Sequence, residues 1–277
     1  MDYTLNCNGR LLALNEPQVM GILNVTPDSF YADSRQQTEH DVAKRTEEIL
    51  SQGGTIIDVG ACSTRPDSQP VSEAEETERL RWALAVVRRE APQAIVSVDT
   101  FRPQIARMVV EEFGVDIIND VGMSANSQKD MFRMVSRLRV PYIFMSRKSS
   151  IRDILLDSAE AVDQLRSMGQ KDIIIDPGFG FGKTLEQNYE VMQQMERLQM
   201  LKLPLLVGIS RKSMIYKLLQ TNPEQALNGT TVLHTIALLK GADILRVHDV
   251  SEAVECVKIV AATKSPHSGS RPTLNRK

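Results

Sequence analysis

Short apolar runs rich in isoleucine, valine and leucine recur along the whole chain, and a polar residue follows nearly every one. Eight such runs are centred near Ile22, Ile57, Val96, Ile117, Ile143, Ile174, Leu206 and Leu245. Runs of this length and composition are typical of strands buried on both faces of a parallel sheet. Stretches with the apolar spacing of a helix separate most of them. This alternation predicts an α/β protein built as a single (β/α)8 TIM barrel.

The polar residues at or just beyond the ends of these runs mark a candidate site. They are Asn24, Asp58, Asp99, Asn119, Ser146, Asp176, Ser210, Arg246 and His248. The active site of a (β/α)8 barrel lies at the C-terminal ends of its strands. We therefore expect these side chains to meet at one mouth of the barrel.

The chain divides into three expected segments. Its 277 residues agree with the roughly 250 of a typical barrel of this kind. Residues 1–17 form a lead-in that fits a hairpin across the barrel floor, and residues 18–264 form the barrel. Residues 265–277 are rich in proline, serine, glycine and basic residues, which predicts a disordered tail.

Several helix boundaries are also signalled. Thr38 with Asp41, and Ser72 with Glu75, resemble capping boxes, although aspartate replaces glutamate in the first pair. Proline is favoured in the first turn of a helix. The shortest gap between strands therefore predicts a helix of about three turns over residues 103–113.

Composition excludes several classes of function. The 33 basic and 35 acidic residues give a net charge of -2, which argues against a general nucleic-acid surface. The three cysteines are far apart in sequence and suggest neither a disulfide framework nor a zinc site. Because there is no apolar run long enough to span a membrane and no signal peptide pattern, we expect a cytoplasmic protein without a membrane partner.

The glycine-rich segment at residues 176–184 does not have the spacing of a nucleotide-binding loop. Pro177 occupies the position of the first glycine of a P-loop, and Lys183 that of the last glycine in GxGxxG. We interpret it as a loop after the sixth strand whose glycines permit close backbone approach. A plain tight turn is the alternative.

Carboxylate and amide side chains suggest a pocket for a flat, amide-rich heterocycle. Asp58, Asp99, Asn119 and Asp176 supply both donors and acceptors. A carboxylate that faces an amidine-like edge accepts two parallel N–H bonds. Any one of these residues alone is equally well explained as a helix cap or an ion-pair partner.

A second set of residues is cationic. Arg246 and His248 are two positions apart, so both project from the same face of a strand. Arg211 and Lys212 follow the seventh strand, and loops after strands seven and eight often bind phosphate in this fold. For these two residues an ordinary solvated pair is the alternative. The scattered histidines give little sign of a transition-metal site, but Mg2+ needs few protein ligands and stays compatible.

Seven motifs then carry a specific resemblance. The first reads Met-Gly-Ile-Leu-Asn-Val-Thr-Pro-Asp-Ser-Phe over residues 20–30. The others lie at residues 63–66, 97–100, 117–121, 176–183, 208–213 and 246–249. In order and spacing they resemble the dihydropteroate synthases, a family of pterin-binding barrels in folate biosynthesis. The resemblance implies a transferase that joins 4-aminobenzoate to (7,8-dihydropterin-6-yl)methyl diphosphate and releases pyrophosphate and 7,8-dihydropteroate.

The resemblance also implies roles for individual residues. The pterin is expected on Asp99, Asn119, Asp176 and Lys212. The diphosphate is expected on Arg246 and His248, with Mg2+ on Asn24. The residues expected to act directly in catalysis are Asp99, Lys212, Arg246 and His248.

Further residues are implied around the second substrate. The 4-aminobenzoate site is expected to include Thr64, Arg65, Pro66, Phe181, Ser210 and Lys212, and a second loop to contribute Thr26, Pro27 and Asp28. By the same resemblance the protein is expected to be a homodimer and a target of sulfonamides.

The sequence departs from the family pattern at three places. Ala61-Cys62 precedes the second motif where glycine and glutamate are usual, and Asp67 follows it where glycine is common. After the fifth strand, Ser146-Arg147 replaces the usual His-Met. The last change bears on how the loop after this strand contacts the pterin pocket.

Three other functions fit parts of the pattern. One is a pterin-binding methyltransferase that serves a corrinoid, but this class does not need the motifs at residues 63–66 and 210–213. Another is a non-catalytic pterin-binding paralogue, which loss of the loop motifs would favour. The third is a barrel enzyme for an unrelated phosphorylated substrate, for which the ordered set of seven motifs is not expected.

Overall fold

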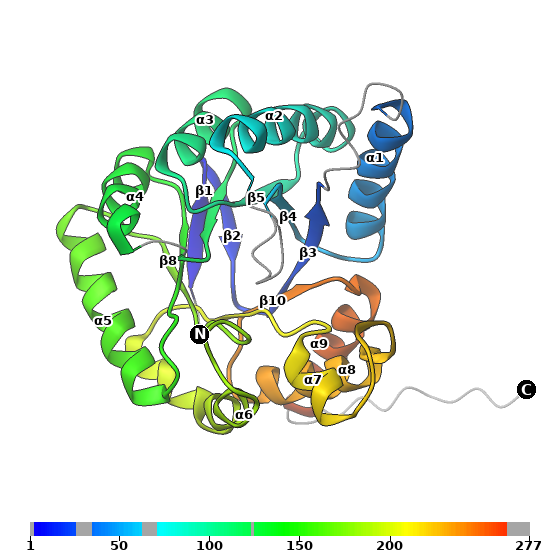
Figure 1. Ribbon diagram of the computed structural model, residues 1–277, viewed down its shortest axis with the longest axis vertical. Coiled ribbons are helices and arrows are strands. Elements are labelled where there is room, and N and C mark those ends of the chain that lie inside the picture. The colour runs from blue at the N-terminus through cyan, green and yellow to red at the C-terminus, as the bar shows by residue number, and fades with distance from the viewer. Residues whose placement is uncertain (1–2, 26–34, 63–70, 123–124, 265–277) are drawn as a thin grey trace, which may run out of the picture.

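The computed structural model shows a closed barrel of parallel strands surrounded by helices (Figure 1). It describes residues 3–25, 35–62, 71–122 and 125–264. The eight strands pair in the order β8-β7-β6-β5-β4-β3-β10-β9. Their bounds are β3 (Gln18–Asn24), β4 (Ile56–Gly60), β5 (Ile95–Asp99), β6 (Ile117–Asp120), β7 (Tyr142–Met145), β8 (Ile173–Asp176), β9 (Leu206–Val207) and β10 (Ile244–Val247).

The barrel closes where its first and last paired strands meet. Ile175 of β8 forms a parallel bridge with Leu205, just before β9. The Ile175 backbone N–H donates to the Pro204 carbonyl at 2.9 Å. Each apolar run of the sequence has become one strand, so the predicted (β/α)8 TIM barrel is confirmed.

Helices follow the strands and form the outer ring (Figure 1). They are α1 (Arg35–Ser51), α2 (Glu73–Glu90), α3 (Pro103–Phe113), α4 (Ala125–Leu138), α5 (Ile151–Ser167), α6 (Leu185–Gln194), α7 (Ser213–Leu218), α8 (Leu227–Leu239) and α9 (Val250–Lys264). The described residues also include the short 3-10 helices η3 (Met195–Leu201) and η4 (Pro223–Gln225). Among the described residues, no helix is both long and apolar enough to cross a membrane.

Two of the three helix boundaries predicted from the sequence agree with the structure, and one does not. The Ser72 hydroxyl accepts the Glu75 backbone N–H at 3.2 Å and caps α2. The predicted helix over residues 103–113 is α3. The cap predicted at Thr38 is wrong, because α1 begins at Arg35 and Thr38 lies inside its first turn. The intervening glutamines are good helix formers, which favours the earlier start.

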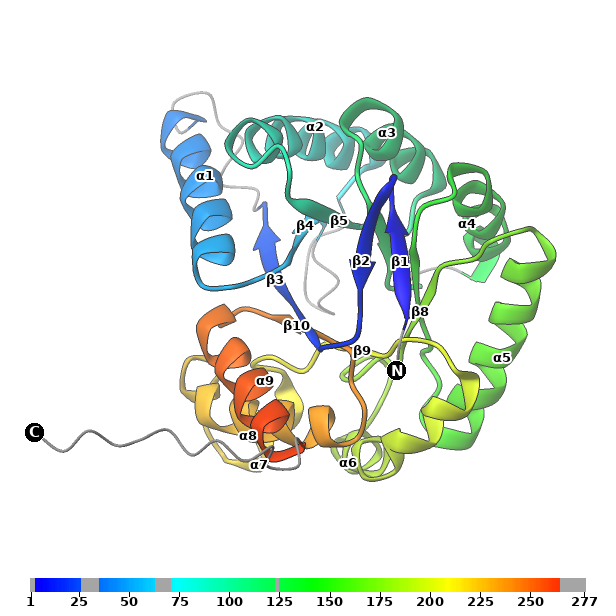
Figure 2. The same ribbon diagram turned by 180° about the vertical axis from the view of Figure 1, so that it is seen from behind.

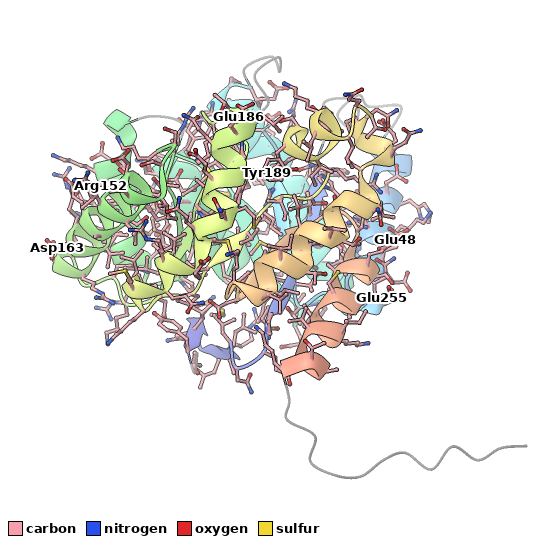
Figure 3. The ribbon with its side chains drawn as sticks, turned by 90° about the horizontal axis from the view of Figure 1, so that it is seen from below. Glu48, Arg152, Asp163, Glu186, Tyr189 and Glu255 are labelled. Atoms are coloured by element: carbon pink, nitrogen blue, oxygen red, sulfur yellow. The ribbon has the colours of Figure 1, made fainter. Side chains whose placement is uncertain are left out.

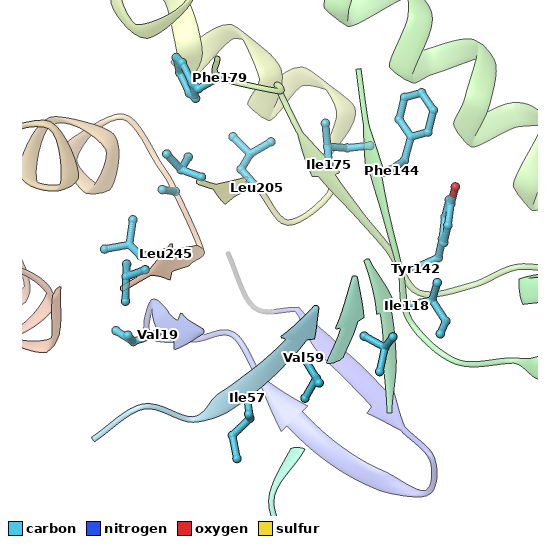
Figure 4. Close-up of a cluster of buried hydrophobic side chains, with 14 of the residues drawn as sticks. Val19, Ile57, Val59, Ile118, Tyr142, Phe144, Ile175, Phe179, Leu205 and Leu245 are labelled. Carbon is cyan, nitrogen blue, oxygen red and sulfur yellow. The ribbon is translucent and has the colours of Figure 1, made fainter. Parts of the chain in front are cut away.

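Two apolar layers hold the barrel together. Residues such as Ile57, Ile118 and Leu245 point outward from the strands and pack under the helices (Figure 4). On the far side of the helices, charged residues such as Arg152 and Glu255 face solvent (Figure 3). This is the pattern of an amphipathic helix that covers a sheet.

The inward layer is sealed by an N-terminal hairpin. Strands β1 (Thr4–Cys7) and β2 (Arg10–Ala13) pair antiparallel and lie across one end of the barrel (Figure 2). Leu5, Cys7 and Leu14 are buried there, against the inward residues of the strands. Burial raises the pKa of the Cys7 thiol to about 12, so it stays protonated and packs as a small apolar group.

An ion-pair and hydrogen-bond network around Asp116 fixes this hairpin to the barrel. Asp116, whose side chain is fully buried, accepts the Arg10 guanidinium at 2.6 Å and the Arg88 guanidinium at 3.1 Å. It also accepts the Val96 backbone N–H at 2.9 Å. Both carboxylate oxygens are therefore bonded, which compensates for the loss of water around a buried charge.

His234 makes the stability of the fold sensitive to acid. It is buried in α8, and neither ring nitrogen has a hydrogen-bond partner among the described residues. Burial lowers its pKa from 6.5 to about 4. Below pH 6.5 the His234 imidazole therefore binds a proton in the unfolded chain but not in the folded one. The free energy of unfolding falls as the pH decreases toward 4.

The expected loss is about 2 kcal/mol of unfolding free energy between pH 7 and pH 5 from this one group. Urea unfolding at a series of pH values measures it. His234→Leu removes the titrating group, so its free energy of unfolding should fall less over the same range. The idea fails when the two proteins show the same pH slope.

Candidate active site at the carboxyl ends of the strands

The inward apolar residues of the strands, which pack on the N-terminal hairpin, form the floor of the barrel interior. A layer of polar side chains lies directly above this floor. Four floor residues are each followed, two positions later on the same strand, by a polar residue. Because side chains alternate between the two faces of a strand, both members of each pair point inward. The pairs are Ile56 and Asp58, Ile117 and Asn119, Ile174 and Asp176, and Ile244 and Arg246.

Arg246 is the centre of this layer. Its Nε donates to Asp58 Oδ2 at 2.6 Å, and its Nη2 donates to Asp99 Oδ2 at 2.9 Å. Asn119 Nδ2 in turn donates to Asp58 Oδ2 at 3.3 Å. The side chain of Asp58 is fully buried and that of Asp99 is 12% exposed. Strands β4, β5, β6 and β10 thus contribute to one charged network, as buried charges require.

Burial acts on the ionisation of this network. It raises the pKa of the Asp99 carboxyl, while the neighbouring Arg246 guanidinium opposes the rise. Burial likewise raises the pKa of Asp176, which Lys212 opposes. Carboxylates with such shifts, gathered at one barrel mouth, are typical of a functional site.

Lys212 faces the loop that follows β8. Its Nζ donates to the Phe179 carbonyl and lies 4.5 Å from the centre of the Phe181 ring. A cation over an aromatic face is attracted by the ring. Burial lowers the pKa of Lys212 to about 8, although Asp176 opposes the shift. Asp176, Phe181 and Lys212 thus lie on one side of the mouth.

Glycines allow this loop to approach its neighbour closely. Gly178 has φ +69°, and a Cβ there would lie 2.3 Å from the Ser146 carbonyl oxygen. Its N–H donates to Asp176 Oδ1 at 2.7 Å. Lys183 closes the loop by donating from Nζ to the Gly178 carbonyl at 2.8 Å. The predicted close backbone approach is confirmed, and the loop fixes one oxygen of Asp176.

Ser210 and His248 meet beyond the ends of the neighbouring strands β9 and β10. Ser210 Oγ accepts the His248 backbone N–H at 3.2 Å and lies 3.1 Å from the ring Nδ1. Burial lowers the pKa of His248 to about 4, and the charge of Arg246 adds to this effect. Arg45 Nη2 donates to the His248 carbonyl at 2.6 Å. The imidazole is therefore neutral near pH 7.

Arg211 is not part of an ordinary solvated pair. Its guanidinium forms a two-pronged ion pair with Asp249, from Nε at 2.8 Å and from Nη2 at 2.9 Å. The solvated-pair alternative is wrong for Lys212 as well, because its Nζ is held against the Phe179 carbonyl.

The departure after the fifth strand has a clear structural setting. Ser146 is buried and its Oγ donates to Asp157 Oδ2 at 2.5 Å. Arg147 is exposed, and its Nη1 donates to the Gly122 carbonyl at 3.2 Å. The replacement thus joins the loops after β6 and β7 at the rim.

The remaining expected residues lie at the end of β3 or outside the ranges that the structure describes. Asn24 is the last residue of β3 and is exposed. Six residues lie outside the described ranges: Thr26, Pro27, Asp28, Thr64, Arg65 and Pro66.

The sequence placed Asp58 in the predicted heterocycle pocket, but it did not show that its carboxylate accepts Arg246. Lys183 received no role of its own from the sequence. Lys183 ends the glycine-rich segment, and burial lowers its pKa to about 8. No sequence signal distinguishes it from a surface lysine.

Comparison with known proteins identifies the family. A family model of the pterin-binding enzymes matches residues 20–248. The dihydropteroate synthase of Clostridium beijerinckii is 39% identical over 87% of this chain and 92% of its own length. That of Escherichia coli K12 is 34% identical over 96% of this chain and 99% of its own length. The chain belongs to the dihydropteroate synthase family.

Solved structures of dihydropteroate synthases have the same fold. The Xanthomonas albilineans enzyme with 4-aminobenzoic acid has a TM-score of 0.85 and 33% identity, over 96% of this chain and 100% of its own. The Vibrio fischeri enzyme has a TM-score of 0.82 and 34% identity, over 95% of this chain and 99% of its own. Dihydropteroate synthases are transferases of folate biosynthesis, and the chain matches them along nearly their whole length.

Proposed function

We propose that the chain condenses 4-aminobenzoate with (7,8-dihydropterin-6-yl)methyl diphosphate to give 7,8-dihydropteroate and pyrophosphate. The observation that supports this most strongly is the polar layer inside the barrel. It offers carboxylate and amide groups in its depth, and Arg246 and His248 lie on one side of it. A flat ring with N–H donors and an anionic leaving group need that combination.

The pterin is assigned to the depth of the barrel. One carboxylate oxygen of Asp176 accepts the Gly178 backbone N–H. This bond fixes the orientation of the carboxylate that would face an amidine-like edge of the ring. Asn119 and Asp99 supply an amide and a second carboxylate from neighbouring strands. Lys212 lies on the same side as Asp176 and offers a donor to a ring acceptor.

The diphosphate is assigned to Arg246 and His248. The guanidinium is held in place by Asp58 and Asp99, and such a fixed cation stabilises a departing anion without first having to reorganise. His248 is neutral in the protein without ligand, and a ring N–H can donate a hydrogen bond to the phosphate oxygens. Its ring is oriented by the Ser210 hydroxyl at 3.1 Å.

The residues present also fit a magnesium ion. Among the described residues no cluster of three histidine, cysteine or acidic side chains could hold a metal. Mg2+, however, binds through few protein oxygens when phosphate and water complete its shell. The exposed Asn24 amide at the end of β3 supplies one such oxygen, and the bound ion would neutralise diphosphate charge.

The reaction forms one bond and breaks another at the pterin methylene. The C–O bond breaks first, and its electron pair leaves with the diphosphate. The ring delocalises the positive charge left at the methylene carbon, and the amine nitrogen of 4-aminobenzoate then attacks this carbon. Asp99 stabilises the transient cation, and the extra proton on the new amine passes to solvent.

The 4-aminobenzoate is assigned to the rim formed by Phe181, Ser210 and Lys212. Phe181 supplies an aromatic face, and Lys212 lies over that face at 4.5 Å. Stacking and a nearby cation suit an aromatic carboxylate. Thr64, Arg65 and Pro66 complete this assignment from the family resemblance.

The proposed activity is tested by pyrophosphate release from the dihydropterin diphosphate, with and without 4-aminobenzoate. We expect stoichiometric release that depends on the amine. Release that is independent of it would indicate a hydrolase, and no release at all would indicate a pterin-binding protein without this chemistry.

Removing Mg2+ with a chelator should lower turnover far more than it weakens binding of a pterin that lacks the diphosphate. The reason is that the ion meets groups present only on the activated substrate. Turnover assays and calorimetry, each with and without added Mg2+, measure the two effects. Asn24→Ala should reproduce the difference, and equal losses for both ligands contradict it.

We also propose that the protein is a homodimer built on α7, α8 and α9. These helices lie next to one another (Figure 1), and several large apolar residues in them or directly after α7 are exposed. They are Leu218, Leu219, Val232, Leu239 and Ile259, each more than half exposed. Large apolar residues exposed on neighbouring helices favour an interface between two copies of the chain. Light scattering should give twice the chain mass, and Val232→Asp should give the mass of one chain.

A further inference from the structure

Arg211 has a backbone conformation that is unusual for a residue with a side chain. Its φ is +53°, in the left-handed region that disfavours residues carrying a Cβ. Its backbone N–H donates to Thr230 Oγ1 at 3.0 Å, which helps to hold this turn. The turn directs Ser210 toward His248 and Lys212 toward the loop after β8. Strain of this kind persists where the surrounding contacts fix it.

The guanidinium of Arg211 is bonded on three of its nitrogens. Nε and Nη2 form the two prongs to Asp249, at 2.8 and 2.9 Å. Nη1 donates to the carbonyls of Pro223 and Glu224, at 2.9 and 2.7 Å. This arrangement needs a planar, forked donor, which lysine does not provide. The side chains of Arg211 and Asp249 are 24% and 18% exposed, so water competes only in part.

The ion pair joins the two segments that carry the cationic side of the site. Arg211 lies between Ser210 and Lys212 after β9, and Asp249 directly follows His248 after β10. β9 and β10 are neighbouring strands, but they pair over only two residue pairs. The spacing of the segments beyond them is therefore set by contacts between the side chains.

We propose that Arg211 is a positioning residue for the condensation. Its ion pair with Asp249 holds Ser210 against His248 and Lys212 over Phe181, and thereby shapes the 4-aminobenzoate site. The pterin contacts assigned to Asp99, Asn119 and Asp176 come from other strands, so of the residues assigned to the pterin only Lys212 lies beside Arg211. This inference rests on the proposed function for its kinetic consequence, but not for its structural one.

The test is Arg211→Lys, which keeps the charge and loses the fork. We expect the KM for 4-aminobenzoate to rise at least tenfold and kcat to fall, while the Kd for a pterin changes much less, because Lys212 is only one of the four residues assigned to the pterin. The matched control is Arg81→Lys. Arg81 makes a similar two-pronged pair with Glu112, at 2.7 and 2.9 Å, on the outside of α2 and α3. The control should leave all three constants unchanged.

A second measurement does not depend on activity. Nitrogen NMR of the His248 ring reports its contact with Ser210, so its resonances should shift in Arg211→Lys and not in Arg81→Lys. Asp249→Asn should shift them as well, which keeps the test decisive when the first variant fails to fold. A protein that releases no pyrophosphate refutes the proposed function, and the NMR shift then decides the positioning role alone.

Two outcomes overturn the inference. In one, Arg211→Lys behaves like its control in both kinetics and NMR. In the other, pterin affinity falls as much as 4-aminobenzoate affinity, which indicates a general effect on the fold.

Discussion

Replacing Arg246 by methionine is expected to lower the free energy of unfolding by about 3–5 kcal/mol. The substitution keeps much of the side-chain volume but leaves Asp58 and Asp99 without their counter-ion inside the barrel. Breaking a buried pair from one side costs more than the pair itself contributes, because an uncompensated charge stays behind. Urea unfolding at pH 7 measures the loss.

A second substitution tests the cause. Asp58→Asn in the Arg246→Met background removes one of the stranded charges, so it should recover part of the stability. Arg81→Met breaks an exposed ion pair and should change stability little. The explanation is refuted when Arg246→Met is as stable as Arg81→Met, or when Asp58→Asn makes it worse.

The same network changes how activity data for Arg246 should be interpreted. The sequence assigns this residue to the diphosphate alone. In the structure it is also the counter-ion of Asp58 on β4 and Asp99 on β5. A loss of turnover in an Arg246 variant therefore combines a chemical and a structural effect, and the rates need correction for the folded fraction.

Asp176→Asn is expected to weaken binding of a pterin by roughly 2–5 kcal/mol. The amide replaces one acceptor oxygen by a donor, which then faces a donor of the ring. The fold should tolerate the change, because the amide oxygen can still accept the Gly178 N–H that now bonds the carboxylate at 2.7 Å. Calorimetry with a pterin measures the affinity.

Asp130→Asn on the outside of α4 is the matched control, since Asp130 is well exposed. It should bind the pterin like the unchanged protein. Unaltered affinity in a folded Asp176→Asn protein would remove Asp176 from the pterin site.

The sequence predicted the barrel well because its signal is local. Each buried strand is a short run of branched apolar residues, and period-two alternation within the run decides which side chains face inward. The helix at Pro103 to Phe113 was predicted to the residue. The position of a helix start is less predictable, because several neighbouring residues can each begin the helix. The start was predicted at Thr38, but α1 begins one turn earlier.

The contacts of the site were less predictable. The ends of the strands showed that Asp99, Asp176 and Arg246 lie at the mouth. They did not show that Arg246 bonds Asp58, which is 188 positions away, because that contact exists only after the barrel closes. The ion pair of Arg211 with Asp249 likewise depends on the exact turn after β9. Sequence thus located the chemistry but not its internal pairing.

The stacking of the polar layer on the apolar floor limits how this protein can change length. Deleting one residue between Ile174 and Asp176 would turn either the floor residue or the site residue out of the barrel, since successive positions face opposite sides. The same holds for the three other strands built in this way. The same alternation of side chains along each strand therefore places both a core residue and a substrate-binding residue inside the barrel. Insertions and deletions in descendants of this chain should be confined to the connections between strands and helices.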